Sequence, residues 1–132
     1  MPTILVADDD PGIRRLLQVV LTQAAECEVH AVADGVQALA GAREMQPVLV
    51  ILDIDMPGLT GLEVCQVLKR EPATRNIPVW LITGSGEPAV VAAAITAGAD
   101  GFFRKPFHPS ELQARVREYT NAVPTAGVAH GV

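Results

Sequence analysis

Short runs rich in apolar residues alternate along the chain with longer amphipathic segments. The short runs predict buried strands, and they lie at residues 3–7, 28–33, 48–52, 79–83 and 101–105. The longer segments repeat apolar residues with helical spacing and predict helices at about 11–24, 35–46, 60–70, 88–97 and from 109 onward. In the first of these helices the apolar positions are Ile13, Leu16, Leu17, Val20 and Leu21.

The alternation of strands and helices predicts an α/β fold, a doubly wound, five-stranded parallel sheet with helices on both faces. Right-handed crossovers bring the carboxyl ends of all strands to one edge of such a sheet, where ligands bind. The length of 132 residues suits a single domain. We expect this domain at residues 1–122, because the segment 123–132 has no periodicity and is typical of a flexible tail or the start of a linker.

Composition narrows the class of protein. Hydrophobic residues make up 49% of the chain and charged residues 19%, which is typical of a globular protein. The net charge of −5 argues against direct binding to nucleic acid, which needs a basic surface. No apolar run resembles a membrane span or a signal peptide, and Cys27 and Cys65 fall in separate predicted helices without metal-binding spacing. We therefore expect a reduced, cytoplasmic protein with no membrane partner.

Chemically active side chains gather at the carboxyl ends of four of the predicted strands. They are Asp8, Asp9 and Asp10 after the first strand, Asp53 and Asp55 after the third, Thr83 at the end of the fourth and Lys105 at the end of the fifth. Each residue alone has an ordinary structural explanation, and we interpret Asp10 and Asp34 as helix caps. Taken together, the set places several carboxylates, one hydroxyl and one ammonium at the edge where ligands bind.

Carboxylates gathered within a few ångströms repel one another and raise one another's pKa, unless a cation neutralises them. Lys105 supplies a single positive charge, so we infer a divalent metal ion. Mg²⁺ suits this set because it takes oxygen ligands and commonly combines one or two carboxylates with a phosphate. A carboxylate beside a metal ion, an ammonium and a hydroxyl is an arrangement for phosphoryl transfer to an aspartate.

Four segments resemble the signature segments of the response-regulator receiver domain of two-component signalling, a CheY-like family with a flavodoxin-like fold: ILVADDDPGIRRLL, VLVILDIDMPGLTGLEV, PVWLITG and GADGFFRKPF. The resemblance extends from residue 3 to about residue 120. It implies that Asp53 is the phosphorylated aspartate. It also implies that Asp8 and Asp9 hold Mg²⁺, with Asp9 the more direct ligand. Asp53 and the backbone carbonyl of Asp55 complete the ligand set that the resemblance implies.

The resemblance further implies how the domain switches. Family members take a phosphoryl group from a phosphohistidine of a sensor histidine kinase or phosphotransfer protein, and they catalyse this transfer and their own dephosphorylation. Thr83 matches the hydroxyl that moves toward the phosphoryl group, and Lys105 matches the lysine that bonds it and precedes a cis peptide bond. Phe102 matches the aromatic residue that follows the threonine. It lacks the hydroxyl of the more common tyrosine, so a switch role and plain core packing both stay open. Asp55 and Ser85 match the positions that tune the lifetime of the phosphate.

The output of such a domain usually passes through the fourth helix, fifth strand and fifth helix. Here the segment AVVAAAITAGA offers small apolar residues for a downstream protein partner or a receiver dimer. Three alternatives are weighed against this function. A haloacid-dehalogenase-like phosphatase would need further acids after Asp55, a flavin module would need a loop that is not anionic after the first strand, and an inactive receiver would lack a key residue. Whether an effector domain follows residue 132 stays open.

Overall fold

The computed structural model describes residues 2–122 and confirms the predicted α/β fold. Parallel strands form one five-stranded sheet in the order β2-β1-β3-β4-β5. The strands are β1 (Thr3–Ala7), β2 (Glu28–Val32), β3 (Leu49–Asp53), β4 (Val79–Thr83) and β5 (Gly101–Arg104). The helices are α1 (Pro11–Ala24), α2 (Gly35–Met45), α3 (Gly61–Arg70), α4 (Pro88–Thr96) and α5 (Pro109–Ala122). The predicted tail at 123–132 lies outside the described residues.

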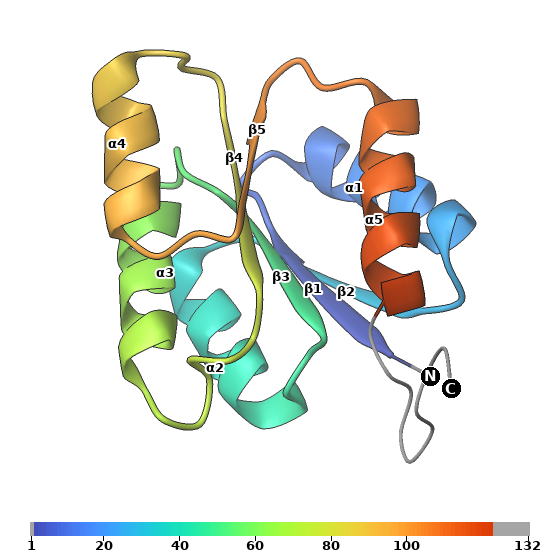
Figure 1. Cartoon of the computed structure of the whole chain (residues 1–132), viewed down its shortest axis with the longest axis horizontal. Helices are drawn as coiled ribbons and strands as arrows, with labels where there is room; N and C mark the ends of the chain where they lie inside the picture. The colour runs from blue at the N-terminus through green and yellow to red at the C-terminus, as the bar shows by residue number, and fades with distance from the viewer. Residues whose placement is uncertain (1, 123–132) are drawn as a thin grey trace.

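Helices cover both faces of the sheet, with α2, α3 and α4 on one face and α1 and α5 on the other (Figure 1). Cys65 of α3 and Ala94 of α4 belong to the first core layer, and Leu17 of α1 and Leu112 of α5 belong to the second. Every residue of β3 and β4 is buried, because these central strands lie between the two layers. A strand that is buried on both faces needs apolar residues at nearly every position, and the sequences of β3 and β4 are accordingly almost continuously apolar.

The strand order positions the site. From β1 the chain passes outward to β2 and then returns to β3 on the other side of β1. The helix after β1 therefore covers one face and the helix after β3 covers the opposite face (Figure 1). At the carboxyl edge of the sheet the loops after β1 and β3 diverge, which leaves room between them for polar side chains.

The predicted helix caps are confirmed. The Asp10 side chain accepts hydrogen bonds from the backbone N–H groups of Gly12 and Ile13 at the start of α1. The Asp34 side chain accepts one from the N–H of Gln37 at the start of α2. Within the described part of the chain, no helix combines the length and the apolar character that crossing a membrane requires.

Both cysteines are buried and free. The prediction that Cys27 lies in a helix is wrong, because α1 ends at Ala24 and the extended backbone of Ala25 (φ −156°, ψ 159°) leads directly toward β2. Cys65 lies in α3, as predicted. Burial raises the pKa of the Cys65 thiol to about 11, so this thiol stays protonated at neutral pH.

Candidate functional site

Three aspartates meet at the carboxyl edge of the sheet, at the point where the strand order reverses. Asp8 follows β1 and Asp53 is the last residue of β3, and both side chains are almost fully buried, with exposed fractions of 1% and 3%. Asp9 is exposed. One carboxylate oxygen from each of the three lies within 4.8 Å of the others. The structure thus brings together three of the acids that the sequence singles out.

Lys105 follows β5 and extends its ammonium group into this cluster. Its Nζ donates a hydrogen bond to Asp8 Oδ2 at 3.1 Å and lies 3.3 Å from Asp53 Oδ2. The peptide bond from Lys105 to Pro106 is cis, in agreement with the prediction. Three carboxylates against one ammonium leave the cluster a formal charge of −2.

Backbone groups hold the two buried carboxylates in place. The N–H of Asp10 donates to Asp8 Oδ1 at 2.9 Å, and the N–H of Asp55 donates to Asp53 Oδ1 at 3.1 Å. Arg14 donates to the backbone carbonyl of Asp8 at 2.8 Å. The sequence did not indicate this role of Arg14. Its position one helical turn after the cap Asp10, beside an acidic run, is the signal that could have revealed it.

The environment shifts the pKa values of the central pair. Burial and the neighbouring charge of Asp8 raise the pKa of Asp53, and they outweigh the Asp55 amide and the Lys105 ammonium, which act in the opposite direction. Burial alone would lower the pKa of Lys105, but hydrogen bonds and charges from Asp8 and Asp53 raise it. Lys105 therefore stays cationic at neutral pH and faces a carboxylate that burial has made more basic.

The donor set fits a Mg²⁺ ion. Carboxylate oxygens are hard ligands of the kind that Mg²⁺ prefers, and a residual charge of −2 matches a divalent cation. Asp8, Asp9 and Asp53 are the residues of the cluster that could hold the ion. No group of three or more His, Cys, Asp or Glu residues elsewhere in residues 2–122 has comparable spacing.

Thr83 closes β4 with a fully buried side chain, and its hydroxyl is turned toward Asp55. Thr83 Oγ1 donates to Asp55 Oδ2 at 3.3 Å and accepts a hydrogen bond from the N–H of Ser85 at 3.1 Å. The exposed carboxylate of Asp55 also accepts from the N–H of Gly84 at 3.5 Å. The predicted role of Asp55 in metal binding concerns its backbone. The contact of its side chain with Thr83 was not predicted.

Phe102, the predicted switch residue, lies on β5 and is half-buried. It packs against the core layer formed with α3 and α4. On α4, Ala94 is buried whereas Ile95 is 72% exposed, so this helix turns a large apolar side chain outward. The predicted output face therefore has an apolar component.

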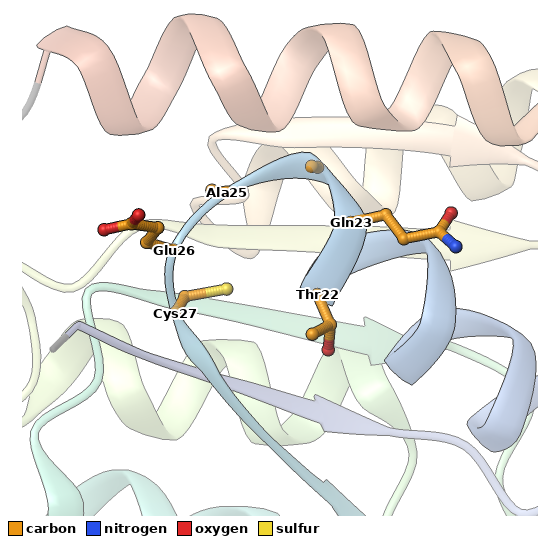
Figure 2. A pocket seen from close by; sticks show the side chains of 6 residues that line it. Thr22, Gln23, Ala25, Glu26 and Cys27 are labelled. Carbon is orange, nitrogen blue, oxygen red and sulfur yellow. The ribbon is translucent and has the colours of Figure 1, made fainter.

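A separate hollow lies at the opposite edge of the sheet, between the end of α1 and the start of β2 (Figure 2). Its lining includes Thr22, Glu26 and Cys27. The Cys27 thiol there contacts the carbonyl of Leu21 at 3.7 Å, and burial raises its pKa. The hollow is thus remote from the acid cluster, and its one thiol is protonated at neutral pH.

The chain is similar to known signalling proteins over most of its length. The model of the response regulator receiver domain matches residues 4–117. The DNA-binding response regulator MtrA of Mycolicibacterium smegmatis is 40% identical over 86% of this chain and 48% of its own length. RpaA of Synechocystis, named a DNA-binding dual master transcriptional regulator, is 38% identical over 96% of this chain and 53% of its own length. The chain thus spans about half the length of these curated relatives.

Solved structures agree with the sequence comparisons. The chemotaxis protein CheY4 of Vibrio cholerae superimposes with a TM-score of 0.83 at 29% identity, over 90% of this chain and 98% of that chain. These matches favour the receiver over the phosphatase and flavin-binding alternatives. The phosphatase alternative is also disfavoured by the position of its required acids, because Asp8 and Asp9 precede Asp53 in the chain.

Proposed function

Because the chain belongs to the response regulator receiver domain family, we propose that it is a phosphorylatable switch whose acceptor is Asp53. The donor is a phosphohistidine of a sensor histidine kinase or of a histidine phosphotransfer protein. An Asp53 carboxylate oxygen attacks the phosphorus, the P–N bond breaks, and its electron pair returns to the imidazole of the donor. Hydrolysis later breaks the new P–O bond, releases inorganic phosphate and restores the carboxylate.

The residues around Asp53 have complementary roles in this transfer. Burial leaves the carboxylate poorly solvated, and the N–H of Asp55 holds one of its oxygens, so the other is oriented toward the entering group. Lys105, which lies 3.3 Å from that other oxygen, would bond an oxygen of the phosphoryl group. Thr83 would donate its hydroxyl to a second phosphoryl oxygen.

Mg²⁺ would be held by Asp8, Asp9 and Asp53 together with the backbone carbonyl of Asp55. When bound, the ion supplies positive charge that offsets the negative charge of the phosphoryl oxygens. The buried Asp8 also fixes Lys105, since its Oδ2 accepts the lysine hydrogen bond. Asp9, which is exposed, is the ligand that faces solvent and the more direct one in this proposal.

The phosphorylated state would reach partners through Thr83 and Phe102. Movement of Thr83 toward the phosphoryl group would vacate space that the Phe102 side chain could then occupy. The resulting shift of β5 would be passed on to α4 and α5. Ser85 and Asp55, which both contact Thr83, would tune the lifetime of the phosphate. The output is a downstream protein or a second receiver bound to the face formed by α4, β5 and α5, where Ile95 is exposed.

The names of the relatives change one expectation. MtrA and RpaA are named as DNA-binding proteins, and the chain spans about half of each. We propose that the expectation of no direct contact with nucleic acid holds for the receiver domain, with its acidic site and net charge of −5. In a longer regulator of their kind, DNA would be bound by a segment outside this domain.

The observation that carries the proposal is the placement of a 3% exposed Asp53 beside Asp8, with the Lys105 ammonium contacting both carboxylates. The test incubates the protein with Mg²⁺ and acetyl phosphate and measures the mass of the intact chain. We expect one phosphoryl group, labile to base, on the wild type and none on Asp53→Asn. Asp100→Asn, which alters an aspartate at the opposite edge of the sheet, should take up label normally. Label on Asp53→Asn would refute the assignment.

A further inference from the structure

The carboxylate of Asp55 joins two loops at the rim of the site. It belongs to the loop between β3 and α3, and its Oδ2 accepts hydrogen bonds from Thr83 Oγ1 at 3.3 Å and from the N–H of Gly84 at 3.5 Å. Both donors belong to the end of β4 and the loop that follows it. This carboxylate therefore contacts the hydroxyl of the proposed switch residue and the backbone directly after it.

The Thr83 hydroxyl has a single proton to donate. In this structure that proton points to Asp55, and the hydroxyl oxygen accepts the N–H of Ser85 at 3.1 Å. A phosphoryl oxygen on Asp53 needs the same proton. The Asp55 carboxylate and the phosphoryl group are therefore competitors for one donor, and each can bond Thr83 only when the other does not.

We propose that the Asp55 side chain is a positioning residue that holds Thr83 in the resting state and opposes the switch. This inference rests on the proposed function. It assigns the two parts of Asp55 opposite tasks, because its backbone N–H supports the Asp53 carboxylate while its side chain restrains the switch hydroxyl. The Thr83 bond of 3.3 Å and the Gly84 bond of 3.5 Å are longer than the usual upper limits of about 3.0 Å for an O–H donor and about 3.2 Å for an N–H donor. The restraint is therefore weak enough for a phosphoryl group to break.

The size of the effect follows from the strength of such a bond. A hydrogen bond of this kind is worth roughly a threefold to tenfold change in an equilibrium. Removing the carboxylate should therefore strengthen binding of a phosphoryl mimic by about that factor. A second explanation predicts the same direction, since the charge of Asp55 also repels an anion near Asp53. The two explanations differ in whether the gain requires the Thr83 hydroxyl.

A double-mutant cycle separates them. Beryllofluoride is titrated in the presence of Mg²⁺ into the wild type, Asp55→Ala, Thr83→Val and the double variant, and binding is followed by calorimetry. We expect Asp55→Ala to bind the mimic roughly threefold to tenfold more tightly than the wild type. We expect the double variant to bind it no more tightly than Thr83→Val. An equal gain in both backgrounds, or no gain in either, would overturn the proposal.

Amide resonances report on the same contacts in the resting state, whereas the tighter binding described above is the readout that a purely structural role would not produce. In the absence of beryllofluoride, the Gly84 and Ser85 amides should shift in Asp55→Ala, because one loses its acceptor and the other bonds the released hydroxyl. Asp55→Asn keeps an acceptor for the Thr83 hydroxyl but removes the charge, so we expect it to gain less affinity for beryllofluoride than Asp55→Ala. A gain as large as that of Asp55→Ala would assign the effect to the charge and overturn the proposal. If the wild type binds no beryllofluoride, the proposed function fails. If it binds and the cycle shows no coupling, only the present inference fails.

Discussion

The Lys105 ammonium lies 3.3 Å from the Asp53 carboxylate and is also bonded to Asp8 at 3.1 Å. Both carboxylates are nearly inaccessible to water, so this lysine offsets charges that solvent cannot screen. The same ammonium is in place to bond a phosphoryl group on Asp53. Lys105 thus offsets buried charge in the resting protein, and in the proposed function it would also bond the phosphoryl group.

Replacing Lys105 by Met should slow phosphoryl uptake from acetyl phosphate by roughly 100-fold, which is the usual cost of losing one positioned electrostatic donor. The chain has one other lysine, Lys69, which pairs with Asp100 at 2.7 Å away from the site. Lys69→Met is therefore the matched control and should leave the rate of uptake unchanged. The rate is measured by intact-protein mass over time, and equal losses in the two variants would contradict the assignment.

Mg²⁺ should raise the thermal unfolding midpoint of the wild type, because a ligand that binds only the folded state stabilises it. Asp9→Ala should abolish this response. Asp10→Ala is the neighbouring control, since Asp10 caps α1 and is not part of the acid cluster. It should lower stability by about 1 kcal/mol through loss of the cap and keep the response to Mg²⁺. The measurement is a thermal scan with Mg²⁺ or with EDTA, and a full response in Asp9→Ala would exclude Asp9 as a ligand.

Asp53→Asn should make the metal-free protein more stable, although it removes the acceptor. The amide keeps the volume of the side chain and removes a buried charge that faces Asp8, while Lys105 keeps its bond to Asp8. The gain in the free energy of unfolding should be on the order of 1 kcal/mol. It is measured by urea unfolding at neutral pH in EDTA. Asp100→Asn, an exposed acid paired with Lys69, should show no gain. A loss in Asp53→Asn would mean that the pair with Lys105 outweighs the repulsion.

Much of the fold and many of the site residues could be predicted from the sequence, because an apolar run or an acidic residue can be recognised without knowing what it contacts. The buried strands Leu49–Asp53 and Val79–Thr83 are nearly continuous apolar runs.

The end of β3 differs from the prediction. Asp53 was expected to follow the strand, yet it belongs to it and pairs with Ile82 of β4. A polar residue looks like the end of a strand in a sequence, whereas backbone pairing does not depend on side-chain polarity.

The contacts between loops could not be predicted in the same way. The bond from Thr83 to Asp55 joins residues 28 positions apart, and it depends on how two irregular loops lie relative to each other. Arg14 reaching the Asp8 carbonyl depends on a side-chain rotamer of α1. Patterns of apolar and polar positions contain neither kind of information, so the sequence predicted which residues gather at the site but not which of them bond.

The junction between β3 and α3 permits only glycine at residue 61. A Cβ atom there would lie 2.4 Å from the backbone oxygen of Asp53, and backbone cannot move aside as a flexible side chain can. Gly61→Ala should therefore lower the free energy of unfolding by about 2 kcal/mol. It should also displace Asp53 and slow phosphoryl uptake. Urea unfolding and the acetyl phosphate assay measure the two effects.

Gly84→Ala is the control for this prediction. Residue 84 also follows a strand at the same edge of the sheet, but a Cβ atom there meets nothing within 4 Å. Alanine keeps the N–H that donates to Asp55, so we expect near wild-type stability. If Gly61→Ala were as stable as Gly84→Ala, the loop after β3 would have to move aside for the new Cβ atom with no loss in the free energy of unfolding. The tight packing of α3 against Asp53 would then not be what fixes the acceptor carboxylate.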